Sequence, residues 1–70
     1  MNADKEFDNI FIYHAPKADQ EQRYAGIRAN AKHMAEYIDG YCPQSKEKDI
    51  ALERLQEAMF WANASIARNE

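Results

Sequence analysis

The fold is decided by residues 40–45, Gly-Tyr-Cys-Pro-Gln-Ser, which separate two segments with the same apolar spacing. Glycine is favoured directly after a helix, proline cannot continue one, and serine is a preferred N-cap. The stretch therefore predicts that one helix ends at about Gly40 and that a second begins after Ser45 and runs to about Arg68.

The segments on either side of this stretch both repeat apolar residues with steps of 3, 4, 3 and 4. Such spacing is typical of a helix with one buried stripe, and two stripes joined by a short turn can face each other. The predicted fold class is therefore all-α, an antiparallel two-helix hairpin. The stripe positions are Tyr24, Ile27, Ala31, Met34 and Ile38 in the first helix, and Leu52, Leu55, Met59, Ala62 and Ile66 in the second.

The region before the first helix is predicted to have no regular structure. Residues 1–9 lack a usable periodicity and are interpreted as a flexible lead-in. Pro16 disfavours helical angles at Ala15, so residues 10–15 are expected to form a short extended arm. We expect residues 10–70 to form a single helical-hairpin domain.

Seventy residues allow only a thin core, because a chain of this size buries about 60% of the surface that its unfolded form exposes. Cys42 is the only cysteine, so an intrachain disulfide is excluded and self-association is the leading source of extra stability. Phe60 and Trp61 flank the stripe of the second helix, and a further helix could cover them. The alternative is that the arm folds over them within one chain.

The net charge of −3 argues against a partner that is a DNA or RNA polymer. Four basic and two acidic residues nevertheless lie between Lys17 and Lys32, which suits a small anionic ligand. No apolar run is long enough for a signal peptide or for a membrane span, so a cytosolic protein is expected. The two histidines and Cys42 lack the close pairing of a metal site, and neither a metal nor another cofactor is expected.

The usual catalytic arrangements are also missing from the sequence. Glu53 and Glu57 lie four residues apart and are explained by a solvated helix face. Cys42 precedes a proline in the turn and has no motif that would provide a base. We therefore expect that the protein is not an enzyme.

Aromatic rings and fixed positive charges lie close together near the start of the first helix. Residues 11–16 read Phe-Ile-Tyr-His-Ala-Pro and are followed by Arg23, Tyr24 and Arg28. A ring can stack on a base and a guanidinium can pair with a phosphate, so the group suits a nucleotide-like anion. The alternative is that the rings are packing residues.

Several polar residues nearby have both a functional and a structural interpretation. Arg28 and Lys32 are four residues apart, so an anion could offset their repulsion, although Glu36 could pair with Lys32 instead. His14 could contact a base or a phosphate, or could stabilise a turn. The amide of Asn63, like that of Asn30, could join the helices or line a polar pocket between subunits.

Four pieces of the chain, taken in order, resemble one family. They are residues 11–16, the Gln-Arg-Tyr and Ile-Arg segments within residues 22–28, Cys42-Pro43 with Ser45, and residues 61–69, Trp-Ala-Asn-Ala-Ser-Ile-Ala-Arg-Asn. These pieces closely resemble the small phage-encoded anti-CBASS sponges for cyclic oligonucleotides, whose hairpin domain is shared with sponges that counter Thoeris signalling. The resemblance covers nearly the whole chain from Phe11 onward.

The resemblance implies a hairpin protomer that assembles into a compact hexamer. Such a hexamer binds host-made cyclic dinucleotides and cyclic trinucleotides without cleaving them. It would act in the host bacterial cytoplasm as an immune evasion protein that blocks the activation of CBASS effectors. A helical adaptor that binds a protein partner is the alternative function.

The resemblance also implies two kinds of ligand site. For cyclic dinucleotides, Tyr13 matches the base-stacking tyrosine and Arg28 the basic residue that binds phosphate, and we add their neighbours Tyr24, Arg23 and His14. For cyclic trinucleotides, a second pocket lies at a different subunit junction. Its nearest matches here are Asn30, Arg68 and His14.

Overall fold

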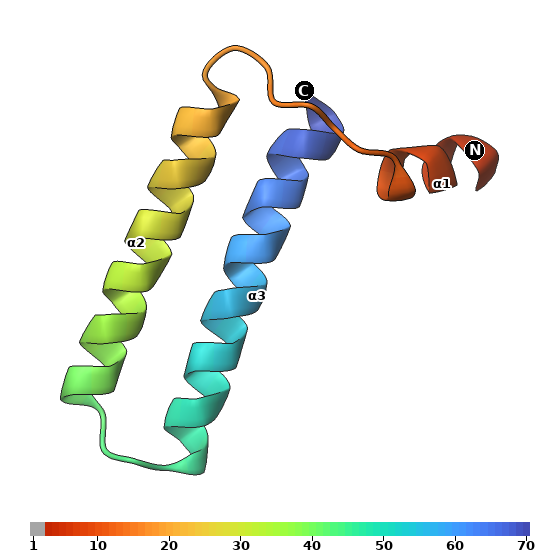
Figure 1. The fold of residues 1–70 in the computed structure, drawn as a ribbon. Coiled ribbons are helices and arrows are strands. Elements are labelled where there is room, and N and C mark those ends of the chain that lie inside the picture. Colours follow the sequence, from red (N-terminus) through yellow and green to blue (C-terminus); the bar gives the residue numbers. More distant parts are fainter. Residues whose placement is uncertain (1–2) are drawn as a thin grey trace.

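The computed structural model describes residues 3–70, and all regular secondary structure in that range is helical. Its three helices are α1 (Ala3–Phe11), α2 (Gln20–Tyr41) and α3 (Lys46–Asn69), and α2 and α3 lie antiparallel (Figure 1). The all-α class and the hairpin are therefore confirmed. The prediction of only two helices was wrong, because α1 precedes them.

Helix α1 occupies a region for which the sequence pattern predicted a lead-in and an extended arm. Phe7, Ile10 and Phe11 lie at positions i, i+3 and i+4 of this helix and form an apolar face, while Asp4 and Glu6 favour its N-terminal end. Three apolar residues in a nine-residue segment are too few to indicate a helix from the sequence alone. The arm without helical structure is consequently residues 12–19, and the flexibility of residues 1–9 stays a prediction.

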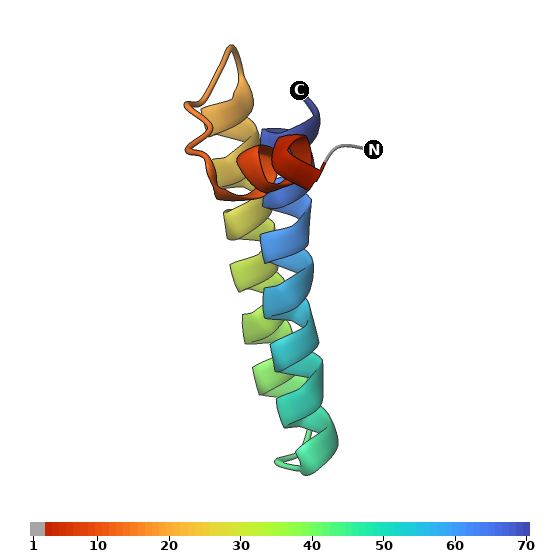
Figure 2. The ribbon, with the colours of Figure 1, turned by 90° about the vertical axis from the view of Figure 1, so that its right-hand side faces the viewer.

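The apolar stripes of α2 and α3 face each other, as the spacing predicts. Helices α2 and α3 pack side by side along their length. Helix α1 projects away from the end of the hairpin that carries the C-terminus (Figure 1), and it overlaps this end only in the turned view of Figure 2. The stripe side chains are half-buried, except for Met34, which is 49% exposed. The hairpin therefore shields its stripe without fully burying it.

The turn between α2 and α3 is closed by polar contacts. Ser45 is the N-cap of α3, and its Oγ accepts a hydrogen bond from the Lys48 backbone N–H at 3.1 Å. The ammonium of Lys48 is buried against α2, where it donates to the Asp39 carbonyl oxygen at 3.0 Å and lies 3.1 Å from Asp39 Oδ1. The predicted cap at Ser45 is confirmed.

The other end of the hairpin is held by four residues that we call the clamp: Lys17, Gln20, Arg23 and Glu70. Lys17 Nζ donates to the Glu70 carbonyl oxygen at 2.9 Å, and Gln20 Nε2 donates to Glu70 Oε1 at 3.2 Å. Both terminal nitrogens of Arg23 bond the same carboxylate. Gln20 is buried and also accepts from the Lys17 backbone N–H at 2.9 Å. The clamp therefore ties the end of the arm to the end of α3.

No apolar side chain in residues 3–70 is fully buried, and several large ones are strongly exposed. Phe60 and Trp61 on α3 are 55% and 63% exposed, and the arm does not cover them. Burial of apolar surface is the main favourable term in folding, so one hairpin alone gains little from it. Self-association therefore stays a prediction, and the exposed apolar side chains give a physical reason for it.

Candidate functional site

The arm and both long helices enclose a shallow hollow of about 450 Å³, which we call the arm groove. The segments that line it belong to the end of the hairpin near α1 (Figure 1). Its size falls within the range of ordinary ligand sites. The lining residues are Ile12, Tyr13, His14 and Pro16 of the arm, Tyr24 and Arg28 of α2, and Asn63, Ala64 and Ala67 of α3.

The arm groove brings together four of the five residues predicted for a cyclic dinucleotide site. Tyr13 is 82% exposed, so its ring is available for stacking, whereas Tyr24 is half-buried. Arg28 and His14 complete the group. Pro16 disfavours helical angles at Ala15, and Tyr13 and His14 lie in the non-helical arm that lines the groove.

His14 also has a structural partner. Its Nε2 lies 2.8 Å from the carbonyl oxygen of Asn9 near the end of α1. A carbonyl oxygen only accepts, so Nε2 carries the proton and donates this bond. The contact joins the arm to α1, which favours the interpretation of His14 as a residue that stabilises a turn.

The side chain of Arg28 takes part in no ion pair or hydrogen bond within residues 3–70, and the same is true of the Lys32 side chain. The expected structural partner of Lys32, Glu36, does not pair with it. The two like charges on this strip of α2 are thus uncompensated within the described chain. Arg28 is the one that lines the arm groove, and its guanidinium is free to bind an anion.

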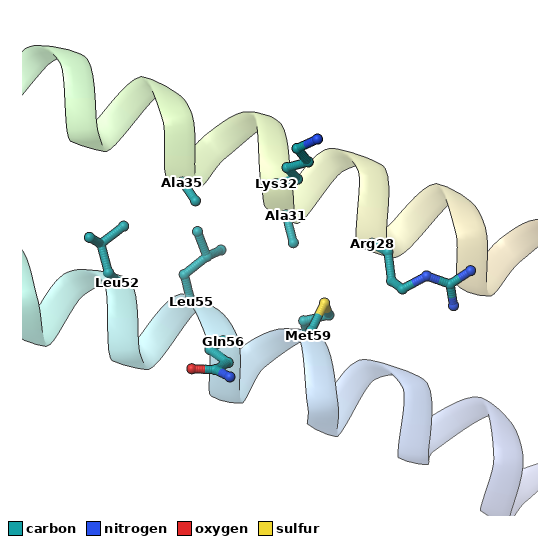
Figure 3. A pocket seen from close by; sticks show the side chains of 8 residues that line it. All are labelled: Arg28, Ala31, Lys32, Ala35, Leu52, Leu55, Gln56 and Met59. Atoms are coloured by element: carbon teal, nitrogen blue, oxygen red, sulfur yellow. The ribbon is translucent and has the colours of Figure 1, made fainter.

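A second hollow, the hairpin groove, continues from Arg28 along the two long helices (Figure 3). It measures about 330 Å³ and is mostly apolar. Figure 3 shows the Arg28 side chain extending along the space between the helices, whereas the Lys32 ammonium points away from α3. The other lining residues are Ala31 and Ala35 of α2, and Leu52, Leu55, Gln56 and Met59 of α3.

Arg23, the remaining predicted ligand residue, lies outside the arm groove, and both of its terminal nitrogens bond within the clamp, whereas its Nε is buried without a hydrogen-bond partner in residues 3–70. Its Nη2 lies 3.2 Å from Asp19 Oδ1, and it also bonds the Glu70 carboxylate. The bond to Glu70 is the main cause of a raised pKa at Arg23. The Arg23 guanidinium in turn lowers the pKa of Glu70 to about 2, with a further bond from Gln20. Arg23 is already neutralised in this chain.

The residues predicted for a cyclic trinucleotide site line three separate hollows. Asn30 lies in a different groove together with Met34, and its Nδ2 donates to the Gly26 carbonyl oxygen at 2.8 Å. Arg68 lies over the ring of Trp61, with Cζ 5.9 Å from the ring centroid. His14 belongs to the arm groove. A single chain does not bring these side chains together, so the predicted site requires a subunit junction.

Asn63 is the groove residue that sequence reasoning left out of the ligand set. Its Oδ1 is buried and has no hydrogen-bond partner within residues 3–70. An acceptor buried in this way costs about 1–3 kcal/mol. Its neighbours Ala64 and Ala67 are small and leave space above α3. The sequence feature that could have indicated Asn63 as a ligand residue is its amide next to the apolar stripe of α3, followed by small residues.

The described residues offer neither a metal centre nor a membrane span. No cluster of three histidine, cysteine or acidic side chains in residues 3–70 is arranged to hold a metal ion. Cys42 is exposed in the turn. None of the three helices has both the length and the apolar content that crossing a bilayer requires.

Comparison with known proteins identifies the chain through a family model. No curated protein and no solved structure matched it. The model of the Acb2/Tad1 hairpin domain matches residues 3–67, a range that includes α1, the arm and nearly all of the hairpin. The chain therefore belongs to the Acb2/Tad1 hairpin-domain family.

Proposed function

We propose that the protein is a sponge that sequesters host cyclic dinucleotides and cyclic trinucleotides without cleaving them. Its action in the host bacterial cytoplasm would keep CBASS effectors inactive. The observation that carries the proposal is the arm groove, where the exposed Tyr13 ring lies beside an Arg28 that has no ion pair in residues 3–70. A ring supplies a stacking surface for a base and a guanidinium binds phosphate.

The arm groove is half of the proposed site. It is open to solvent, and it supplies one strongly exposed tyrosine ring, that of Tyr13, and one guanidinium without an ion pair in residues 3–70, that of Arg28. A cyclic dinucleotide has two bases and two phosphates, so two grooves related by a two-fold axis would match it. The exposed Phe60 and Trp61 provide apolar surface for such contacts, and a homohexamer is the proposed assembly.

Cyclic trinucleotides are proposed to bind at another junction, where Asn30, Arg68 and His14 come from neighbouring subunits. Arg68 supports this part of the proposal because, within residues 3–70, its positive charge has only an aromatic partner, the ring of Trp61. Cation–π contact leaves the N–H donors at the edge of the guanidinium free. They remain able to bind a phosphate.

Sequestration requires stoichiometric binding and no chemical step. The test is incubation of the protein with a panel of cyclic di- and trinucleotides, followed by isothermal titration calorimetry and native mass spectrometry. Heat release and chromatography then report the state of the ligand. The proposal predicts intact ligand at a fixed ratio to subunits. Linear or shortened products would replace it with a phosphodiesterase.

The exposed aromatic residues of α3 favour one other function, a helical adaptor that binds a protein partner. Phe60 and Trp61 are more than half exposed in the single chain, as an interface residue would be. In that case the arm groove would bind none of the cyclic nucleotides in the panel. Calorimetry without heat and without a shift of the melting temperature would favour the adaptor.

A further inference from the structure

Asn63 is the only polar side chain that α3 contributes to the arm groove. The other two α3 residues in the wall are Ala64 and Ala67, which have no group that could form a side-chain hydrogen bond. Tyr13 and Arg28 lie on the arm and α2 sides of the same groove. A flat ring bound there would therefore have its edge near an amide.

The amide of Asn63 differs from the other two asparagine amides of the long helices. Asn30 and Asn69 each donate to the carbonyl oxygen four residues earlier, at 2.8 Å and 2.9 Å. The side-chain amide of Asn63 forms no hydrogen bond within residues 3–70, and its Oδ1 is buried without a partner. No hydrogen bond within residues 3–70 holds this amide in its present orientation.

An amide that is free to turn about its terminal torsion can present both of its polar atoms to a ligand. That torsion joins a tetrahedral and a planar carbon and has a broad energy profile. One face of the amide then offers an acceptor, Oδ1, and a donor, Nδ2. This pair is complementary to the N6 donor and the N7 acceptor of adenine, whereas a 6-oxo purine presents two acceptors at the same edge.

We propose that Asn63 reads the edge of the base in the arm groove and makes the site prefer adenine over 6-oxo purines. The inference rests on the proposed function, because it concerns the ligand of the same groove. A bond to the adenine N6 group would satisfy the buried Oδ1. The residue would thus determine specificity, with Tyr13 and Arg28 supplying the contacts that every base and phosphate can use.

The test uses two probes that differ at the 6-position of the purine: cyclic di-AMP, and cyclic di-IMP, in which a carbonyl replaces the amino group. The proteins are the unaltered chain, Asn63→Ala and the control Asn69→Ala, whose amide is bonded within α3. Alanine is a better helix former than asparagine, so both variants keep the helix. Native mass spectrometry checks their assembly, and calorimetry measures affinity.

We expect the unaltered chain to bind cyclic di-AMP roughly tenfold more tightly than cyclic di-IMP. Asn63→Ala should lose this preference mainly by weaker binding of cyclic di-AMP, and Asn69→Ala should retain it. Equal affinities in the unaltered chain, or a preference that survives Asn63→Ala, overturn the inference and leave the sponge intact. Dissociation of the assembly by Asn63→Ala would show that the amide joins subunits, which also overturns it. Failure of both probes to bind the unaltered chain overturns the inference together with the proposal that the arm groove binds cyclic purine dinucleotides, and absence of binding across the whole panel overturns the sponge itself.

Discussion

The clamp and the arm groove lie at the same end of the hairpin, and each contains one arginine of α2. Arg23 in the clamp is bonded to two carboxylates, whereas Arg28 in the groove has no charged partner within residues 3–70. The sequence places both in one cluster of positive charge. The structure divides that cluster into a cation used for folding and a cation left for a ligand.

The difference arises from a contact that joins distant parts of the chain. Glu70 is 47 residues away from Arg23 and reaches it only because α3 returns antiparallel to α2. Five residues further along α2, more than one turn, Arg28 lies beyond the reach of that carboxylate. The position along the hairpin therefore decides which arginine is neutralised.

The largest effect is expected when the two arginines are removed separately. Arg28→Ala should weaken cyclic dinucleotide binding by about 2 kcal/mol, roughly thirtyfold, since hydrogen bonds to a charged group are lost. Its melting temperature should change little because Arg28 has no partner to lose. Arg23→Ala should lower the melting temperature and affect binding far less. Calorimetry and thermal unfolding of both variants check this contrast.

A matched control for the loss of an arginine is Arg54→Ala. Arg54 is exposed on α3, where it pairs with Glu57 at 2.7 Å, and it lines neither the arm groove nor the hairpin groove. It should retain the affinity of the unaltered chain. Equal weakening by Arg28→Ala and Arg23→Ala would contradict the division between groove and clamp.

The next largest effect is expected from the stacking ring of the groove. Tyr13→Ala should weaken cyclic dinucleotide binding by about 1.5 kcal/mol, roughly tenfold, because a base loses its aromatic contact. Tyr41→Ala is the control, since Tyr41 is 75% exposed but stacks on Tyr37 at the turn. Calorimetry should separate the two variants. Unchanged binding by Tyr13→Ala would place the ligand elsewhere.

The parts of the structure that were predictable depend on contacts between residues close in sequence. The apolar stripes and the cap at Ser45 follow from helical spacing and local hydrogen bonding, and both are confirmed. Helix α1 was missed because its three apolar residues, Phe7, Ile10 and Phe11, make a short pattern beside a proline-restricted arm. A nine-residue helix gives little periodicity to detect.

The candidate site was predictable only where its residues are neighbours. Tyr13, His14, Tyr24 and Arg28 could be grouped because the arm leads directly into α2. Asn63 could not be assigned to the same groove, since its place there depends on the packing of α3 against α2. Arg23 could not be excluded from the predicted ligand residues either, because its engagement depends on a bond to Glu70, which is distant in sequence.

A small effect is expected from Lys32, the other cation of α2 without an ion pair in residues 3–70. Its ammonium points away from α3 in Figure 3, so it acts on a ligand in the arm groove only through solvent. Lys32→Ala should weaken cyclic dinucleotide binding by about 0.4 kcal/mol, roughly twofold. Titrations at low and high salt measure this, because screening should remove the difference. A loss as large as that of Arg28→Ala would extend the phosphate site along α2.

The smallest effect on binding is expected from Glu70, whose role lies entirely in the clamp. Arg23 and Gln20 lower its pKa from 4.5 to about 2 in the folded chain. The folded state is therefore stabilised where Glu70 is ionised, above about pH 4.5, and loses this contribution as the pH falls toward 2. At neutral pH, Glu70→Gln should bind cyclic dinucleotides like the unaltered chain but should be less stable.

Between pH 4.5 and 2 the stabilities of the two proteins should converge, because protonation removes from the unaltered chain what the substitution has already removed. Urea unfolding at fixed protein concentration across this range measures the difference, and the fixed concentration keeps any assembly equilibrium constant. A difference that stays constant with pH would show that the amide of glutamine disturbs the clamp in some other way. Convergence of the two unfolding free energies, together with an unchanged ligand affinity of Glu70→Gln at neutral pH, would show that clamp and arm groove are independent. The reason is that the clamp contains Glu70, whereas no carboxylate lines the arm groove.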